Sequence, residues 1–385
     1  MLQHTSQMIH LEKYTSGKQV KHQTGYTYFM PNQVNDSWIW EDQSINKLLE
    51  KAAIKLGELN SFSKLVPNID LFIQLHVTKE AVVSSRIEGT QTQMDEALLD
   101  EDEISPERKN DWLEVHNYIN ALNHAIKELE TLPISSRLIK KTHQILLDSV
   151  RGENKQPGEF RNSQNWIGGN SLADAVFIPP NQIYVNELMG DLEKFLHNED
   201  INVPALIKIG IAHYQFETIH PFLDGNGRIG RLLITLFLVD QKILNKPLLY
   251  LSAFFEKNKG LYYDNLTFVR TKNDMKQWVK YFLVGVAETA EIATSSLSKV
   301  LELKTRLEHN INTNFGKRTK NAAILLQHLF KKPVIHVNQV KNLTNSTYKT
   351  ANDLVTEFVN AGILKEMTGQ SRNRVFVFDE YLNLF

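Results

Sequence analysis

The chain contains 385 residues, 42% of them hydrophobic, and its 43 basic and 44 acidic side chains give a formal charge of -1. This length predicts two or three domains with hydrophobic cores, while the balanced charge excludes a general attraction to nucleic acid or membranes, so such a partner would need a local patch. Cysteine is absent, which excludes disulfides, thiol nucleophiles and thiolate metal sites.

The N-terminal region begins with polar residues. Segment 1–12 has no apolar stretch of signal-peptide length, and the chain nowhere approaches the roughly 18 apolar residues of a membrane span, so we expect a cytoplasmic protein without membrane contact. Residues 1–40 are expected to form an arm over the surface of the main domain. Amphipathic helices are predicted over about 42–59 and from after Pro67 to Gly89.

The end of this second helix carries two polar side chains on one face. Ser84 and Glu88 lie four residues apart, and Gly89 is a natural helix stop. From residue chemistry alone, Glu88 is most simply a solvated carboxylate.

The middle of the chain alternates loops and helices before its character changes. Segment 100–107 is acidic and predicts a loop, and helices are predicted from Pro106 to Ile126 and over 135–147. After Pro157, two short extended runs surround a glycine-rich turn, which predicts a β-hairpin. On its own this is an ordinary surface hairpin.

The stretch from His220 to Arg231 reads HPFLDGNGRIGR and lies between two apolar segments of helical spacing, one after Pro204 and one from Leu232. We therefore predict a turn between two buried helices. Gly225 and Gly227 allow consecutive backbone N–H groups to converge on one point.

The first turn of the following helix completes an anion site. The helix that begins near Arg228 directs its positive end at the same point, and Arg231 lies three residues further on the same face. Both guanidinium groups can therefore reach oxygens of one phosphate chain, and a triphosphate fits better than a single phosphate.

Two further residue types complete the chemistry. Asp224 suits a magnesium ion that bridges two phosphate oxygens, and His220 can take a proton from an incoming hydroxyl. The pattern predicts transfer of part of a nucleotide to a hydroxyl.

The same stretch resembles the signature of the Fic family, HPFx[DE]GNGRxxR, with every fixed position filled. The resemblance implies a Fic helical core and transfer of AMP from ATP to a Ser, Thr or Tyr hydroxyl of a protein. Relatives such as the Doc kinase toxins tend to have Lys in place of Gly227, so adenylyl transfer is favoured. By position it implies these roles: His220 as general base, Asp224 as magnesium ligand, Gly225, Asn226 and Gly227 as phosphate cradle, and Arg228 and Arg231 as ligands of the outer phosphates.

Two upstream segments also match Fic patterns. Residues 84–89 match the inhibitory motif [ST]xxxE[GN], which implies that Ser84 and Glu88 belong to an inhibitory helix and that Glu88 pairs with Arg231, denying the γ-phosphate its partner. The hairpin resembles the flap that holds the target backbone as an added strand, here about 166–178. Its predicted flap residues are Ile167, Gly168 and Ile178.

Downstream of the signature, Tyr262 and Tyr263 stand at the start of another predicted helix. Such a pair is usually packing, but family members often use one against the adenine and ribose, which implies that Tyr263, and less directly Tyr262, contacts the nucleotide. Helices are then predicted through 278–286 and over 287–314.

The C-terminal region follows a basic break at 316–318. Predicted helices over 321–330, 337–343 and 346–360 precede strands at 363–367 and 375–378, an order that resembles a winged helix-turn-helix. Lys349, Arg372 and Arg374 could reach DNA phosphates. The third helix also exposes Asp353 and Glu357, so protein contact or dimer packing is equally compatible.

These patterns predict a mainly α protein with three parts: an N-terminal arm and helical region with the inhibitory helix (1–115), a Fic catalytic core with a β-hairpin flap (116–315) and a winged-helix domain (316–385). The predicted function is an autoinhibited protein adenylyltransferase that uses ATP and Mg2+ and modifies other proteins or itself. Two alternatives stay open, a nucleotide-responsive DNA-binding regulator and a hydrolase that removes AMP, in which Glu88 would orient water. A homodimer is also left open.

Overall fold

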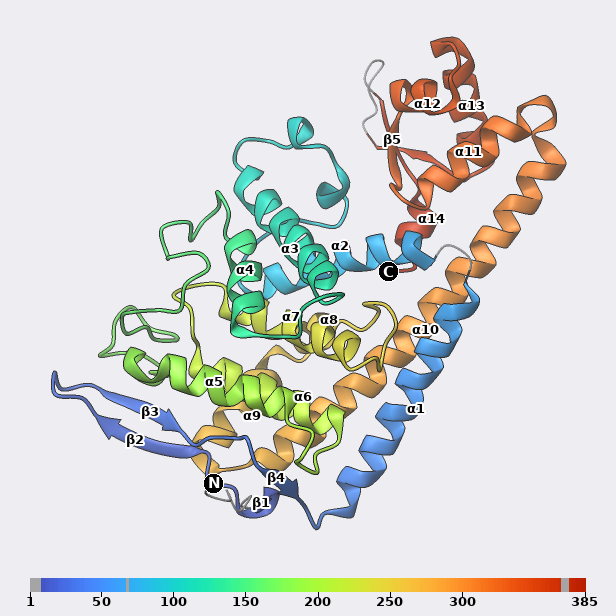
Figure 1. Cartoon of the computed structure of the whole chain (residues 1–385). Helices are drawn as coiled ribbons and strands as arrows, with labels where there is room; N and C mark the ends of the chain where they lie inside the picture. The colour runs from blue at the N-terminus through green and yellow to red at the C-terminus, as the bar shows by residue number, and fades with distance from the viewer. Residues whose placement is uncertain (1–7, 67–68, 368–373) are drawn as a thin grey trace.

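A computed structural model describes residues 8–66, 69–367 and 374–385 (Figure 1). Pro67, expected before the second helix, and Arg372 lie outside the described residues. The fold is mainly α, as predicted, and none of the helices in this part of the chain combines the length and apolar character that a membrane crossing requires. The helices are α1 Gln43–Leu65, α2 Ile69–Ile87, α3 Lys109–Glu128, α4 Ser136–Leu146, α5 Val185–His197, α6 Ala205–Ile219, α7 Asn226–Asp240, α8 Ser252–Lys257, α9 Lys259–Lys272, α10 Met275–Asn314, α11 Thr319–Leu329, α12 Val337–Thr344, α13 Tyr348–Asn360 and α14 Asp379–Leu382.

The N-terminal arm contains short strands that the sequence did not predict. β2 (Gly17–Lys21) and β3 (Thr27–Pro31) form an antiparallel hairpin, and β1 (Met8–His10) pairs in parallel with β4 (Ser37–Ile39). Tyr28 and Phe29 anchor the hairpin because both rings are buried. The arm therefore covers the main domain as expected, but as a hairpin (Figure 1).

The long helix α10 is one continuous element, so the prediction of two helices was wrong. Its apolar stripe passes without interruption through Val286 and Ala287, both buried. Gly285 just before them does not break the helix, and it lies against the Phe254 ring. Helix α1 packs along it (Figure 1), and Lys280 forms a 2.5 Å ion pair with Asp42, the residue that caps α1.

The central helices α6 and α7 are buried on all sides rather than on one face. All residues of α6 after Ala205 are buried, and so are most of those in α7, because α2, α3, α5, α9 and α10 surround the pair (Figure 1). A helix that is hydrophobic all round belongs in the middle of a protein. The turn between α6 and α7 is thus held by rigid, fully packed elements.

The C-terminal region contains the predicted helices α11, α12 and α13, followed by β6 (Lys365–Glu366) and β7 (Val375–Val377). An additional strand, β5 (Val334–His336), joins them in an antiparallel sheet of order β5-β7-β6. The region contacts the loop before α3 through ion pairs of 2.6 Å, Lys332 with Asp100 and His336 with Glu103. Its assignment as a winged helix and the three domain boundaries remain predictions.

Candidate functional site

The turn between α6 and α7 has an unusual backbone that its own side chains hold in place. His220 ends α6 in the left-handed region (φ 50°, ψ 61°), and Gly225 opens α7 with φ 72°. A left-handed backbone conformation is unfavourable for residues other than glycine, so contacts with neighbouring residues must stabilise the conformation of His220. Asn226 does part of this, since its side chain accepts the Phe222 N–H and donates to the Phe222 carbonyl, both at 2.8 Å.

Arg161 clamps this turn from outside, and the sequence did not reveal it. Its side chain donates to the carbonyls of His220 (2.9 Å), Ile219 (3.3 Å), Pro180 (2.5 Å) and Ser163 (3.3 Å) while the residue is only 2% exposed. Burial lowers the pKa of Arg161 to about 10, which leaves the guanidinium charged. One side chain thus joins the end of α6 to both ends of the flap.

His143 holds the other side of the turn and was also missed. Its Nδ1 accepts the Gly158 N–H (2.9 Å), so the proton is on Nε2, which donates to the Asp224 carbonyl (3.0 Å). The ring stacks on Phe222 at 3.7 Å and 7°. Burial lowers the pKa of His143 to about 4, so this imidazole is a neutral structural bridge.

The His220 ring is also neutral. Burial first, and then the charges of Arg161 and Arg270, lower its pKa to about 3 against the opposing effect of Glu88. Its Nδ1 is buried and has no hydrogen-bond partner among the described residues, so Nε2 is the nitrogen that a substrate could reach. A neutral imidazole can accept a proton, as the predicted role requires.

Arg231 and Glu88 form the ion pair that the sequence predicted. Arg231 donates from Nη2 to the Glu88 carboxylate (2.7 Å) and to the Ser84 carbonyl (2.8 Å), and from Nε to the Ser84 hydroxyl (2.9 Å). Burial alone would raise the pKa of Glu88, but the Arg231 charge outweighs it and lowers that pKa. Gly227 allows the Glu88 carboxylate to approach α7, because a Cβ at this position would lie 2.3 Å from the Glu88 Oε1.

Arg228 has a carboxylate partner that was not predicted. It pairs with Glu114 of α3 at 3.0 Å and approaches Asp224 at 3.6 Å. Glu114 is buried and also pairs with the largely exposed Arg151 at 3.0 Å. No pattern in the sequence signalled Glu114, because α3 reads as an ordinary amphipathic helix.

A second buried carboxylate, that of Glu217, lies over the face of α7 that carries Gly227 and Gly230. Glu217 is one turn before His220, and its Oε1 has no hydrogen-bond partner among the described residues. This atom lies where a Cβ on Gly230 would be, at 2.2 Å from the ideal position. Burial raises the pKa of Glu217 to about 7, and Glu88 adds to the increase while Arg231 opposes it.

The two extended runs of the predicted flap are joined by a short antiparallel pairing, and the glycine-rich tip between them is a loop. Within 158–180, all of which the structure describes, a single β-bridge joins Ile167 and Phe177. Gly168 follows with φ 70°, and Asp174 caps the backbone of the tip with its carboxylate. Side-chain hydrogen bonds of this kind compete with strand formation.

The base of the flap is attached to neighbouring elements. The Ile178 carbonyl accepts the Phe29 N–H (2.9 Å), which joins the arm to the flap. The Arg270 guanidinium of α9 lies 3.9 Å from the Phe177 ring centre and donates to the Thr218 hydroxyl (3.2 Å). The flap is therefore connected to the last turn of α6.

The two tyrosines of α9 differ in accessibility. Tyr262 is 1% exposed, stacks on Phe255 and bonds to His213 at 2.9 Å, so it belongs to the core and its predicted nucleotide contact has no support. Tyr263 is 42% exposed, and its pKa is raised to about 12 by burial and then by Glu88. Tyr263 is thus the tyrosine of the two that solvent can reach.

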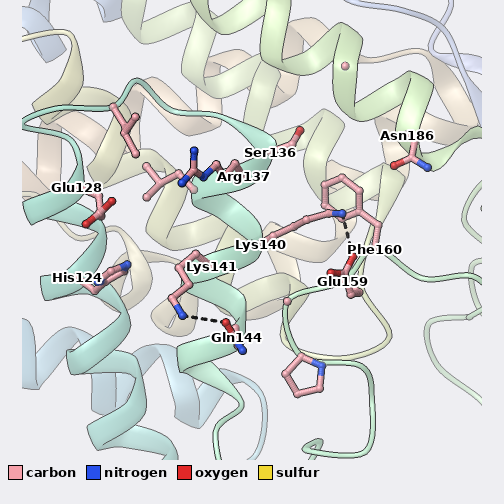
Figure 2. Close-up of a pocket in the computed structure, with 15 residues that line it drawn as sticks. His124, Glu128, Ser136, Arg137, Lys140, Lys141, Gln144, Glu159, Phe160 and Asn186 are labelled. Carbon is pink, nitrogen blue, oxygen red and sulfur yellow. Dashed lines mark hydrogen bonds and ion pairs between the residues drawn. The ribbon is translucent and has the colours of Figure 1, made fainter.

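A separate cleft of about 740 Å³ lies between α3, α4, α5 and segment 157–160 (Figure 2). None of the predicted site residues lines it. Figure 2 shows Lys140 paired with Glu159 and Lys141 bonded to Gln144 along its wall. Gly158 and Phe160 connect its wall to His143 and to the Phe222 ring, but because no predicted site residue opens into it we do not assign the chemistry to it. Nor do the described residues contain a group of three or more His, Cys, Asp or Glu side chains that could hold a metal.

Comparison with known families agrees with this geometry. The Fic/DOC family N-terminal model matches residues 46–127, and the Fic/DOC family model matches residues 133–238, which include the whole turn. The chain therefore contains a Fic/DOC N-terminal region and a Fic/DOC domain. The matched Fic regions contain Glu88, Arg161 and the residues from His220 to Arg231.

Relatives of this Fic protein are similar over half of its length. It is 29% identical over 196 residues to a probable protein adenylyltransferase of Aquifex aeolicus, covering 50% of this chain and 58% of the relative. It is 28% identical over 205 residues to protein adenylyltransferase Fic of Aedes aegypti, covering 50% and 37%. The chain thus covers 58% and 37% of the lengths of these two relatives.

Solved structures share the fold. A Fic family protein from Desulfovibrio desulfuricans G20 superposes with a TM-score of 0.52 at 19% identity, covering 88% of this chain and 96% of that one. A Fic domain containing signaling protein from Bacteroides thetaiotaomicron gives 0.52 at 19% identity, covering 66% and 97%. At this identity the likeness concerns the fold alone.

Proposed function

We propose that this Fic protein transfers AMP from ATP to a Ser, Thr or Tyr hydroxyl of a protein, including itself, and that Glu88 holds it inactive. The observation that carries the proposal is the 2.7 Å ion pair between Glu88 and Arg231 beside the GNG turn. A carboxylate occupies the guanidinium that an outer phosphate of ATP would need. The names of the relatives support the reaction class.

The proposed chemistry uses the turn as follows. Backbone N–H groups from Gly225 to Gly227, together with Arg228 and Arg231, bind the triphosphate. The target hydroxyl loses its proton to Nε2 of His220 and attacks the α-phosphorus, so that a new P–O bond forms and pyrophosphate leaves. The pKa of His220 is low in the free protein, and bound phosphates would raise it because their negative charge favours the imidazolium.

Magnesium fits the residues present. The Asp224 side chain is 39% exposed at the mouth of the turn, and Mg2+ is commonly bound by one or two carboxylates together with substrate phosphates. Asp224 would hold the ion, which when bound neutralises phosphate charge. Arg228, at 3.6 Å, would keep that carboxylate in place.

The remaining partners follow from the surroundings of the turn. Ile167, Gly168 and Ile178 would present the target backbone to His220 from the flap. Tyr263 would contact the nucleoside, because its ring is exposed and its pKa responds to the charge of Glu88. The inhibitory segment would include Ser84, which holds the Arg231 guanidinium by two hydrogen bonds.

The DNA-binding alternative has less support from the C-terminal region. Arg374, expected to reach phosphates, bonds to Asn352 (2.5 Å) and pairs with Glu366 (3.5 Å). On α13, Asp353 and Glu357 pair with Arg318 at 3.7 and 2.9 Å. Arg374 and Arg318 are therefore already paired with acidic or amide side chains of this region, whereas Lys349 is exposed.

Label transfer from ATP tests the proposal. The chain is incubated with α-labelled or γ-labelled ATP and a cell lysate, and labelled proteins are identified by mass spectrometry. We expect α-label on protein hydroxyls, increased in Glu88→Gly, unchanged in the exposed control Glu107→Gly and lost in His220→Ala. Transfer of the γ-label instead would show a kinase, and removal of AMP from a pre-labelled target by the wild-type chain would show the hydrolase. No transfer by folded Glu88→Gly would refute the proposal.

A further inference from the structure

A cavity of about 170 Å³ lies behind the inhibitory helix, where α2, α8 and α10 meet. Val83, Phe254, Ile292 and Ala293 supply most of its apolar wall. Figure 1 shows these three helices together near the C-terminal end of the chain. Nothing in the proposed reaction uses this cavity.

Three buried polar groups line the same cavity. The Nε2 of His76 lies 3.2 Å from the Leu248 carbonyl, and it is the donor because a carbonyl can only accept. The Nδ1 of the neutral ring is therefore a buried acceptor, and it has no partner in the described structure. Tyr250 is 5% exposed, and its hydroxyl is equally unpartnered. Glu80 is buried, and its Oε1 accepts from the hydroxyls of Tyr118 (3.0 Å) and Ser252 (2.5 Å).

Buried polar atoms are nearly always hydrogen-bonded, so two unpartnered atoms in one cavity need an explanation. Burial, together with the charge of Lys79, lowers the pKa of His76 to about 4, so its Nδ1 is an acceptor at neutral pH. A ligand that satisfies it must supply a hydrogen-bond donor. Lys79 and Lys257 line the cavity together with Glu288 and with Glu80, whose pKa burial raises to about 7. The wall therefore has no large excess of either charge, and a neutral ligand fits it.

We propose that this cavity is a binding site for a small neutral molecule of the phenol class, which places an aromatic ring against Val83 and Phe254 and donates its hydroxyl to Nδ1 of His76. The size agrees, because a protein cavity of about 150 Å³ holds one benzene ring. The Tyr250 hydroxyl would then donate to the phenol oxygen.

The position of the cavity gives the site a further consequence. Val83 lines it, and the next residue, Ser84, bonds to Arg231. Glu80 is one turn earlier on the same helix. A ligand that packs against α2 therefore alters the environment of the Arg231 guanidinium, whatever reaction the turn performs.

The test uses the full-length protein with labelled Ile, Val and Ala methyl groups, titrated with phenol or with toluene, which has nearly the same shape but no donor. We expect phenol to shift the methyl signals of Val83, Ile292 and Ala293, and toluene to bind about five-fold more weakly, the usual loss for one hydrogen bond. The Arg231 Nε–Hε signal should shift with phenol in parallel.

Two variants and one control make the result decisive. Ala253→Leu fills the cavity from an exposed position of α8 and should abolish the shifts, whereas Ala53→Leu, exposed on α1, should not. Tyr250→Phe should weaken phenol about five-fold and leave toluene unchanged. Equal affinity for phenol and toluene, or shifts that persist in Ala253→Leu, would overturn the site. Methyl shifts without a change at Arg231 would overturn its link to the inhibitory helix.

Discussion

Removal of the Glu88 carboxylate should destabilise the free protein and activate it at the same time. In Glu88→Ala, Arg231 loses one charge-assisted hydrogen bond, an interaction of roughly 1.5–3 kcal/mol. The Arg231 side chain is 2% exposed but that of Glu88 is 34% exposed, so solvent screening places the loss near the lower end, about 2 kcal/mol. Arg231 keeps its two bonds to Ser84 and stays in position.

The same interaction competes with the γ-phosphate of ATP, so its loss should favour productive binding by a similar free energy. About 2 kcal/mol corresponds to a roughly 30-fold increase in the rate of AMP transfer at subsaturating ATP. Urea unfolding measures the first effect and transfer of α-labelled AMP the second, with Glu107→Ala as a control for both. ATP should also stabilise the variant more than the wild type. A variant that is less stable but transfers AMP at the wild-type rate would refute the competition between Glu88 and the γ-phosphate. Unchanged stability would refute the energy assigned to the Glu88–Arg231 ion pair.

Three further substitutions test other parts of the site. Gly230→Ala should lower the free energy of unfolding by about 1–2 kcal/mol although alanine favours helices. The new Cβ would lie 2.2 Å from the Glu217 carboxylate and 3.1 Å from the Phe216 ring. The control Gly190→Ala on α5 meets nothing within 4 Å, so its free energy of unfolding should rise by up to about 1 kcal/mol. Urea titrations of both variants decide this, and equal effects would contradict it. Because the pKa of Glu217 is raised to about 7, the folded protein holds a proton that the unfolded chain releases near 4.5, so stability should fall as the pH rises from about 4.5 to 7. Glu217→Gln should flatten this fall by about 2–3 kcal/mol in unfolding experiments at each pH, and an unaltered slope would exclude Glu217 as its source. Arg161→Lys keeps the positive charge but loses the planar guanidinium that donates to four carbonyls. It should lower the free energy of unfolding by about 2 kcal/mol or more and the rate of AMP transfer at least ten-fold. A Lys variant with the wild-type rate would show that these hydrogen bonds are dispensable for transfer.

The elements that could be predicted were those whose evidence lies within a short stretch of chain. Helical spacing placed α6 and α7, and the residues from His220 to Arg231 indicated the turn between them. The pairing of Glu88 with Arg231, 143 residues apart, was implied by a family motif and is present at 2.7 Å. The split of α10 was wrong, because local patterns cannot show packing against α1. The flap hairpin is limited to one antiparallel bridge, since Asp174 binds the backbone of its tip.

The sequence alone therefore predicted the kind of chemistry that we propose, because phosphate binding and proton transfer use glycines, arginines and a histidine at close spacing in the chain, and these are local properties. Only the tertiary structure decided how the turn is held. Arg161, His143 and Glu114 act through backbone carbonyls or through charges from distant helices, and no periodicity or spacing records such partners. The packing also decided that Tyr262 is a core residue and Tyr263 is accessible, since burial depends on which helices surround a side chain.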